Sequence, residues 1–173
     1  AKTDADRASA LAFLSDLKYF WQGNSAEAQT ILAEAVRLAR ASGDSQTLLL
    51  TLGALGDLNW WLGNFDDAKA ALDESLALAR ALEDLTAELS IFNRLGTVAI
   101  TQGDLDKAER LLSETHTRAL AAGARGLVLA TLNNLGWTAA ERNDHALAKE
   151  YQQQYLTNYR EIGNPGGIAL ALA

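Results

Sequence analysis

Residues 55–68, LGDLNWWLGNFDDA, recur as LGTVAITQGDLDKA at 95–108 and as LGWTAAERNDHALA at 135–148. A more divergent copy, SDLKYFWQGNSAEA, occupies 15–28, so that each copy begins 40 residues after the one before it. A period of this size is typical of proteins built from stacked copies of one supersecondary unit. The sequence therefore predicts a repeat protein.

Each copy contains a turn residue at the same place, namely Gly23, Gly63, Gly103 and Asn143. Glycine and asparagine tolerate the positive φ that is common just beyond the end of a helix. An Asn or Asp follows each of them and can cap the next helix, as Asn24, Asn64, Asp104 and Asp144. An alanine lies about one turn further on and permits close helix contact, as Ala28, Ala68, Ala108 and Ala148. Each junction therefore predicts a helix, a tight turn and a second helix.

These turns divide the chain into two alternating types of helix. We expect first-type helices near 8–22, 46–62, 86–102 and 126–142, and second-type helices near 25–41, 65–82, 105–121 and 145–162. Tyr151, Tyr155 and Tyr159 recur at a spacing of four residues, which predicts a core stripe rather than a cofactor site. The pairs Leu55-Gly56, Leu95-Gly96 and Leu135-Gly136 predict points where a helix approaches its neighbour closely.

Length and composition fit one domain over residues 1–173, since 49% of the residues are apolar and only one is proline. Fifteen basic and 22 acidic residues give a net charge of −7, which disfavours direct binding to nucleic acid. No uninterrupted apolar run approaches the roughly 18 residues of a membrane span, and the N-terminal residues lack a signal-peptide pattern. We therefore expect no membrane partner and take a cytoplasmic location as the default.

The repeated pattern resembles the tetratricopeptide repeat, in the long-helix form with a 40-residue period seen in kinesin light chains and bacterial signal-transduction regulators. The residues that carry the resemblance are Leu55-Gly56, Gly63, Phe65 and Ala68, then Leu95-Gly96, Gly103, Leu105 and Ala108, then Leu135-Gly136 and Ala148. The first copy has Ser15-Asp16 in place of Leu-Gly. The resemblance implies an all-α, right-handed solenoid of antiparallel helix pairs, with repeats at approximately 6–44, 45–84, 85–124 and 125–164.

Residues 166–173, which follow Pro165, match the start of another first-type helix, because Leu172 continues the series Leu52, Phe92 and Leu132. We expect here either an incomplete fifth repeat or a short capping helix. The first alternative implies that the chain is a segment of a longer protein. Either alternative leaves apolar surface through which the chain could self-associate.

The resemblance also implies a binding surface, because first-type helices line the concave face in this family. The candidate positions are Trp21, Asp57, Trp61, Asn93, Arg94, Thr97, Asn133, Asn134, Trp137 and Glu141, with Phe13, Leu17, Phe20, Trp60 and Thr101 on the same helices. Asparagine suits an extended peptide because its amide both donates and accepts hydrogen bonds.

The asparagines have a second interpretation, in which they bridge adjacent repeats inside the fold. Trp60 and Trp61 are neighbours on one helix and point about 100° apart, so we expect one of them to be a core residue.

Catalysis within this chain has little support in the sequence. His116 lies on a second-type helix and His145 in a turn, and no acidic or hydroxyl partner recurs with them, so a capping or solvated role is favoured for both. The chain has no cysteine, no metal-ligand cluster and no phosphate-binding loop, and we expect no cofactor.

Two functions remain for this non-enzymatic chain. The leading hypothesis is a scaffold that binds a protein or peptide on its concave face. The alternative is a sensory repeat module of a larger bacterial transcription regulator or signalling ATPase, which responds to a peptide or small molecule.

Overall fold

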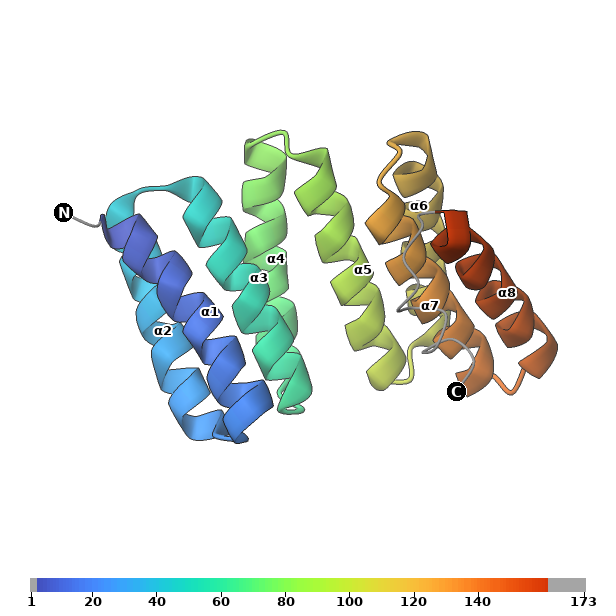
Figure 1. Ribbon diagram of the computed structural model, residues 1–173, viewed down its shortest axis with the longest axis horizontal. Coiled ribbons are helices and arrows are strands. Elements are labelled where there is room, and N and C mark those ends of the chain that lie inside the picture. The colour runs from blue at the N-terminus through green and yellow to red at the C-terminus, as the bar shows by residue number, and fades with distance from the viewer. Residues whose placement is uncertain (1–2, 162–173) are drawn as a thin grey trace. The chain divides into compact units, whose positions relative to one another are not determined.

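The computed structural model describes residues 3–161, and within that range it contains eight α-helices and no strand (Figure 1). The helices are α1 (Asp4–Gln22), α2 (Ser25–Ser42), α3 (Ser45–Trp61), α4 (Phe65–Ala81), α5 (Leu85–Thr101), α6 (Leu105–Ala121), α7 (Arg125–Glu141) and α8 (His145–Glu161). The predicted all-α architecture of helix pairs is confirmed. Every helix end lies within one residue of its expected position except the start of α1.

Helix α1 begins earlier than expected because Thr3 forms a capping box with Asp6. The Thr3 hydroxyl oxygen accepts a hydrogen bond from the Asp6 amide at 3.1 Å, and the Asp6 carboxylate accepts one from the Thr3 amide at 3.0 Å. Two otherwise unpaired groups are thereby satisfied at the helix start.

The four predicted turn residues all adopt positive φ, with values of 62° at Gly23, 78° at Gly63, 78° at Gly103 and 61° at Asn143. This confirms the reason inferred for glycine and asparagine at these positions.

The capping prediction is confirmed for three of the four residues that follow these turns. Asn24, Asp104 and Asp144 each accept a hydrogen bond from the backbone amide three residues on, at distances of 3.1, 3.2 and 3.0 Å. The prediction is wrong for Asn64, whose side chain forms no capping hydrogen bond.

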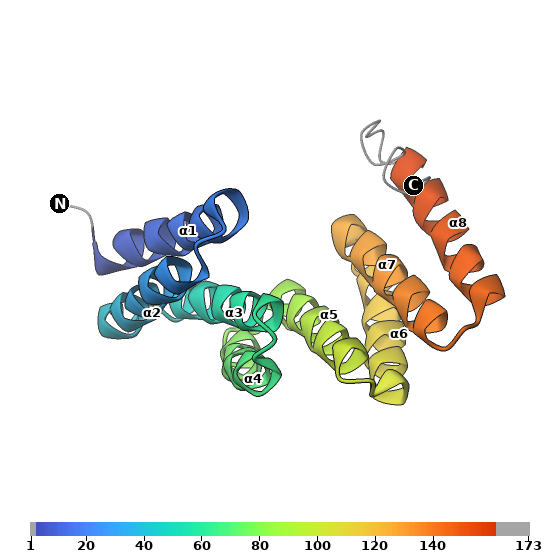
Figure 2. The same ribbon diagram turned by 90° about the horizontal axis from the view of Figure 1, so that it is seen from below.

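The chain divides into two compact units, one ending at Ile91 and the other beginning at Phe92, so the boundary lies inside α5. In the first unit α1 packs against α2 and α3, and α3 packs against α4; in the second, α7 contacts both α6 and α8 (Figures 1 and 2). One core cluster of the first unit consists of Ala28, Leu32, Ala35 and Leu58. The second unit has a cluster of Ala99, Ile100, Ala108, Leu112 and Leu135. The single domain expected over 1–173 stays a prediction.

Close helix contact occurs at two of the three Leu-Gly pairs. A Cβ atom added at Gly56 would lie 2.6 Å from Leu72 Cγ, and one added at Gly96 would lie 2.7 Å from Leu112 Cγ. In each case the buried leucine of the following helix fills the space that the glycine leaves. At Gly136 the corresponding atom would lie 3.6 Å from Tyr151 Cβ, which is an ordinary contact.

The repeat alanines show the same difference between the fourth helix pair and the others. Ala28, Ala68 and Ala108 are completely buried, whereas Ala148 on α8 is only half-buried. The distances at the repeat glycines show that α7 and α8 approach each other less closely at this point than α3 and α4 or α5 and α6 do.

The partial or capping helix expected at 166–173 lies outside the described residues, and the self-association inferred for it stays a prediction. Among the residues that the structure does describe, no helix has the length and apolarity needed to cross a membrane.

Candidate functional site

In the first unit, one face of α1 exposes large apolar side chains. Phe13 is 66% exposed, Phe20 57% and Trp21 83%, and Leu17 lies between them with 37% exposure. Positions 13, 17, 20 and 21 fall on one side of a helix because 3.6 residues make one turn. Large apolar side chains that are exposed together on one helix face are uncommon on the surfaces of folded monomers. We call these four residues the α1 surface.

An aromatic cluster holds the C-terminal ends of α1 and α3 together. The ring of Tyr19 stacks on that of Trp61 with centroids 5.4 Å apart, and Phe20 meets Trp61 edge-on at 4.4 Å. The Tyr19 hydroxyl donates to the backbone oxygen of Trp61 at 3.5 Å. Phe20 thus belongs both to this cluster and to the α1 surface, so the cluster fixes one end of that surface.

Trp60 and Trp61 are both half-buried, and their ring centroids lie 6.4 Å apart. Trp61 packs against the core cluster that contains Leu32 and Leu58. Neither tryptophan is fully buried, but of the two it is Trp61 that packs on this core cluster, in line with the expectation that one of them contributes to the core.

In the second unit, Asn134 connects α7 with α5. Its Nδ2 atom donates hydrogen bonds to Asn93 Oδ1 and to Thr97 Oγ1, both at 3.0 Å, and the side chain is 9% exposed. The geometry favours the bridging interpretation for this asparagine. Asn133 is exposed, and its Nδ2 atom lies 3.5 Å from Asn134 Oδ1, so its amide is the better placed of the two to meet a partner.

Of the remaining candidate positions, Glu141 is exposed and the others are only partly accessible. Trp137 is half-buried against the core cluster of the second unit, and its Nε1 atom donates to Glu141 Oε1 at 2.9 Å. Asp57 and Arg94 are half-buried on α3 and α5. The structure thus groups the candidates into an aromatic set in the first unit and an amide-rich set in the second.

His116 is neither a helix cap nor fully solvated, contrary to expectation. Its Nδ1 atom lies 2.9 Å from the hydroxyl of Thr131, whose own proton is donated to a backbone carbonyl of α7. This contact links α6 with α7. Burial lowers the pKa of His116, although a hydrogen bond with the Val128 backbone acts in the opposite direction. Across residues 3–161, no group of His, Asp and Glu side chains is arranged to hold a metal ion.

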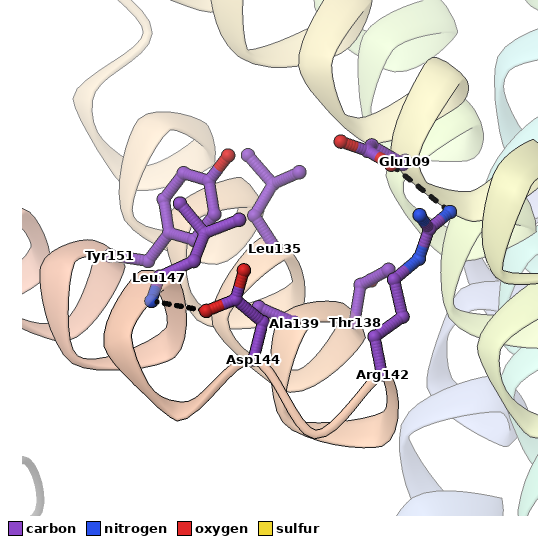
Figure 3. A pocket seen from close by; sticks show the side chains of 8 residues that line it. All are labelled: Glu109, Leu135, Thr138, Ala139, Arg142, Asp144, Leu147 and Tyr151. Carbon is purple, nitrogen blue, oxygen red and sulfur yellow. Dashed lines mark hydrogen bonds and ion pairs between the residues drawn. The ribbon is translucent and has the colours of Figure 1, made fainter.

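Sequence reasoning missed a pocket of about 260 Å³ in the second unit (Figure 3). Its lining comes from α6, α7, α8 and the turn between the last two, and comprises Glu109, Leu135, Thr138, Ala139, Arg142, Asp144, Leu147 and Tyr151. One signal in the sequence could have indicated it. Leu72 and Leu112 are 40 residues apart, and the residue 40 positions after Leu112 is Gln152 instead of a leucine.

Ionic contacts surround this pocket. Arg142 pairs with Glu109 at 3.1 Å and also with Asp106, while Asp144 Oδ1 accepts a hydrogen bond from the Leu147 amide at 3.0 Å (Figure 3). Burial raises the pKa of Tyr151, and the negative charges of Glu109 and Glu150 add to this rise.

Comparison with known families agrees with this geometry. The profile of the tetratricopeptide repeat matches residues 6–81 and 87–161, which together make up most of the chain. The protein therefore belongs to the tetratricopeptide repeat family. The comparison with curated proteins found no matching sequence.

Several solved structures share the fold. Aspartyl phosphate phosphatase F from Bacillus subtilis superimposes with a TM-score of 0.80 at 11% identity, over 95% of this chain and 43% of the phosphatase chain. BtubC from P. vanneervenii gives a TM-score of 0.80 at 18% identity, over 97% of this chain and 70% of the other. A protein described as a kinesin light chain from Podospora anserina, with nearly identical TPR-like repeats, gives a TM-score of 0.70 at 16% identity. The superposition covers 91% of this chain and 77% of the other. The chain thus spans less than half the length of the phosphatase.

Proposed function

We propose that this protein is a non-catalytic scaffold that binds a protein or peptide through its first-type helices. The observation that carries the proposal is the α1 surface, where three aromatic rings and a leucine face solvent on one side of one helix. Large aromatic side chains contribute most of the binding energy in many protein interfaces because they bury much apolar area. The fold family agrees with this role, since tetratricopeptide repeats are in general protein-binding scaffolds.

The second unit would contribute polar contacts to a partner. Asn133 is exposed, and its Nδ2 atom lies 3.5 Å from Oδ1 of Asn134, whose own amide is hydrogen-bonded to α5. An amide that is fixed in this way can pair with a peptide backbone without regard to the partner's side chains.

Peptides selected from a displayed random library against the whole chain would test this proposal. Trp21→Ala and Phe13→Ala should each weaken the selected peptides by about 30-fold if these rings are hot spots worth about 2 kcal/mol. Leu120→Ala is the matched control, because Leu120 is 54% exposed but lies on the second-type helix α6. Equal affinity of the wild type and of both aromatic variants would refute the proposal.

The alternative is a sensory repeat module within a larger regulator. It is favoured by the similarity to a phosphatase chain of which this sequence covers only 43%. Determining the sequence that surrounds this segment in its gene would separate the two functions. A neighbouring nucleotide-binding motif or helix-turn-helix would support the regulator, and its absence from the complete gene would remove that alternative. The cytoplasmic location expected from the sequence stays a prediction.

A further inference from the structure

The pocket of the second unit lies on a different side of α7 from the candidate peptide-binding residues. Leu135, Thr138, Ala139 and Arg142 face the pocket, at spacings of three and four residues. Within the second unit, a ligand in the pocket would thus occupy a site separate from Asn133.

The pocket follows the looser seam between α7 and α8. In the two preceding helix pairs a leucine fills the space beside the repeat glycine, but Gln152 stands at that position in α8 and is exposed. Tyr151 becomes the nearest neighbour of Gly136 instead. This arrangement is particular to the fourth repeat. The polar and aromatic lining residues of the pocket are also not repeated in the preceding copy. The residues 40 positions before Glu109, Arg142, Leu147 and Tyr151 are Lys69, Gln102, Lys107 and Leu111.

The inner walls of the pocket are apolar. Leu135 and Ala139 are each 3% exposed, and the half-buried side chains of Leu147 and Tyr151 face them from α8 (Figure 3). A volume of about 260 Å³ falls just below the roughly 300–1,000 Å³ of sites for drug-sized ligands. The space therefore suits one slender apolar chain, of the size of a single side chain.

The charges at the pocket favour a cation. Arg142 is the one basic group of the lining, and it is paired with Glu109 and with Asp106, while Asp144 adds a third carboxylate. In the lining itself, the two carboxylates of Glu109 and Asp144 outnumber the one guanidinium of Arg142, and the exposed Asp106 lies outside the lining. The face of the Tyr151 ring offers a second attraction for a cation that comes near it.

The free carboxylate oxygens favour an ammonium over a guanidinium. Glu109 Oε2 is bound by Arg142 and Asp144 Oδ1 by the Leu147 amide, which leaves one oxygen of each carboxylate as an acceptor. Single oxygens from two separate side chains suit a compact point charge, whereas a guanidinium binds best to both oxygens of one carboxylate.

We propose that this pocket binds an alkylammonium group, supplied by a lysine side chain or by a free aliphatic amine. The alkyl stem packs against Leu135, Ala139 and Leu147. The ammonium group lies between Glu109 and Asp144, next to the ring of Tyr151.

NMR titration of the whole isotope-labelled chain tests the proposal, with Nα-acetyl-lysine methylamide, butylamine and the uncharged Nα-acetyl-norleucine methylamide as probes. We expect saturable shifts at Ala139, Leu147 and Tyr151 with the two amines and at least about tenfold weaker binding of norleucine. Tighter binding of the lysine derivative than of butylamine would identify a peptide side chain as the source. The reverse order would identify a free amine.

Two variants then locate the interaction. Glu109→Gln and Tyr151→Leu should each weaken the amine probes by about two- to fivefold, as expected for loss of a partly exposed charge or cation–π contact. Glu114→Gln is the control, because Glu114 also lies on α6 and pairs with Arg118 outside the pocket. Dispersed spectra of each variant would show that it is folded. The proposal is overturned if no probe gives saturable shifts, if norleucine binds as well as the amines, or if Glu109→Gln and Tyr151→Leu bind as the wild type does.

Discussion

Replacing the repeat glycines by alanine would measure the difference in packing between the helix pairs directly. The same substitution is made at Gly96 and Gly136, which hold equivalent positions in consecutive repeats of the second unit. In each helix, replacing glycine by alanine stabilises the helical conformation by about 1 kcal/mol, because alanine has the higher helix propensity. The two variants therefore differ only in what the new methyl group meets.

At Gly96 the new Cβ would lie 2.7 Å from both Cγ and Cδ2 of Leu112, which is itself completely buried. Such overpacking costs about 1–3 kcal/mol, which offsets or exceeds the gain in propensity. At Gly136 the nearest atom would be 3.6 Å away, so only the gain remains. We expect Gly96→Ala to lower the free energy of unfolding by about 0–2 kcal/mol and Gly136→Ala to raise it by about 1 kcal/mol.

Chemical denaturation followed by circular dichroism would provide both values. Gly126→Ala is the control for propensity alone, because a Cβ at Gly126 would meet no atom within 4 Å. Gly56→Ala in the first unit should behave like Gly96→Ala, since its Cβ would lie 2.6 Å from Leu72. Should Gly136→Ala prove as destabilising as Gly96→Ala, the looser seam between α7 and α8 would be refuted, and with it the account of why the pocket is there.

Three further predictions concern the candidate site. Asn134→Ala should lower the free energy of unfolding by about 1–3 kcal/mol because it removes two hydrogen bonds from a buried amide to the half-buried Asn93 and Thr97. Asn133→Ala should change it by less than about 0.5 kcal/mol, and urea denaturation would measure both values. Trp61→Ala should cost about 2 kcal/mol, less than the roughly 3–5 kcal/mol of a buried tryptophan, while Trp21→Ala should leave the denaturation midpoint unchanged. Because burial lowers the pKa of His116, the unfolded chain binds this proton more readily than the folded chain does. The free energy of unfolding should therefore fall as the pH drops below about 6.5. In measurements of melting temperature against pH, His116→Gln should reduce this fall. If the pH dependence of His116→Gln equals that of the wild type, the lowered pKa of His116 is not its cause.

The helices and turns were predictable because they depend on local chemistry that the repeat displays several times. Positive φ at Gly23 and at Asn143 follows from residue type and position alone. The start of α1 was missed because its capping box at Thr3 lies before the first copy of the repeat, where no second example indicates it.

The candidate site was less predictable because its properties depend on contacts between helices. Asn133 and Asn134 are adjacent and chemically identical, yet one is exposed and the other is buried with two hydrogen-bond acceptors on α5. The sequence left their two interpretations open because the direction of each side chain depends on the packing of α5 against α7. His116 was misjudged for the same reason, since its partner Thr131 lies on the next helix.

Departures from the repeat indicate where this chain differs from a uniform stack of helix pairs. At Ser15 the first copy replaces the repeat leucine with a buried hydroxyl that donates to the Ala28 backbone at 2.9 Å, so the contact between α1 and α2 becomes polar but stays tight. At Gln152 the fourth copy loses a leucine without such a replacement, and Tyr151, which lines the pocket, is the nearest neighbour of Gly136 instead. The substitution at Ser15 keeps a contact between the paired helices, whereas the one at Gln152 removes the leucine contact. We connect the loss of this contact with the space for a ligand. Restoring the contact with Gln152→Leu should therefore bring α8 closer to α7, and loss of amine binding in that variant, with stability maintained, would connect the departure in sequence to the site.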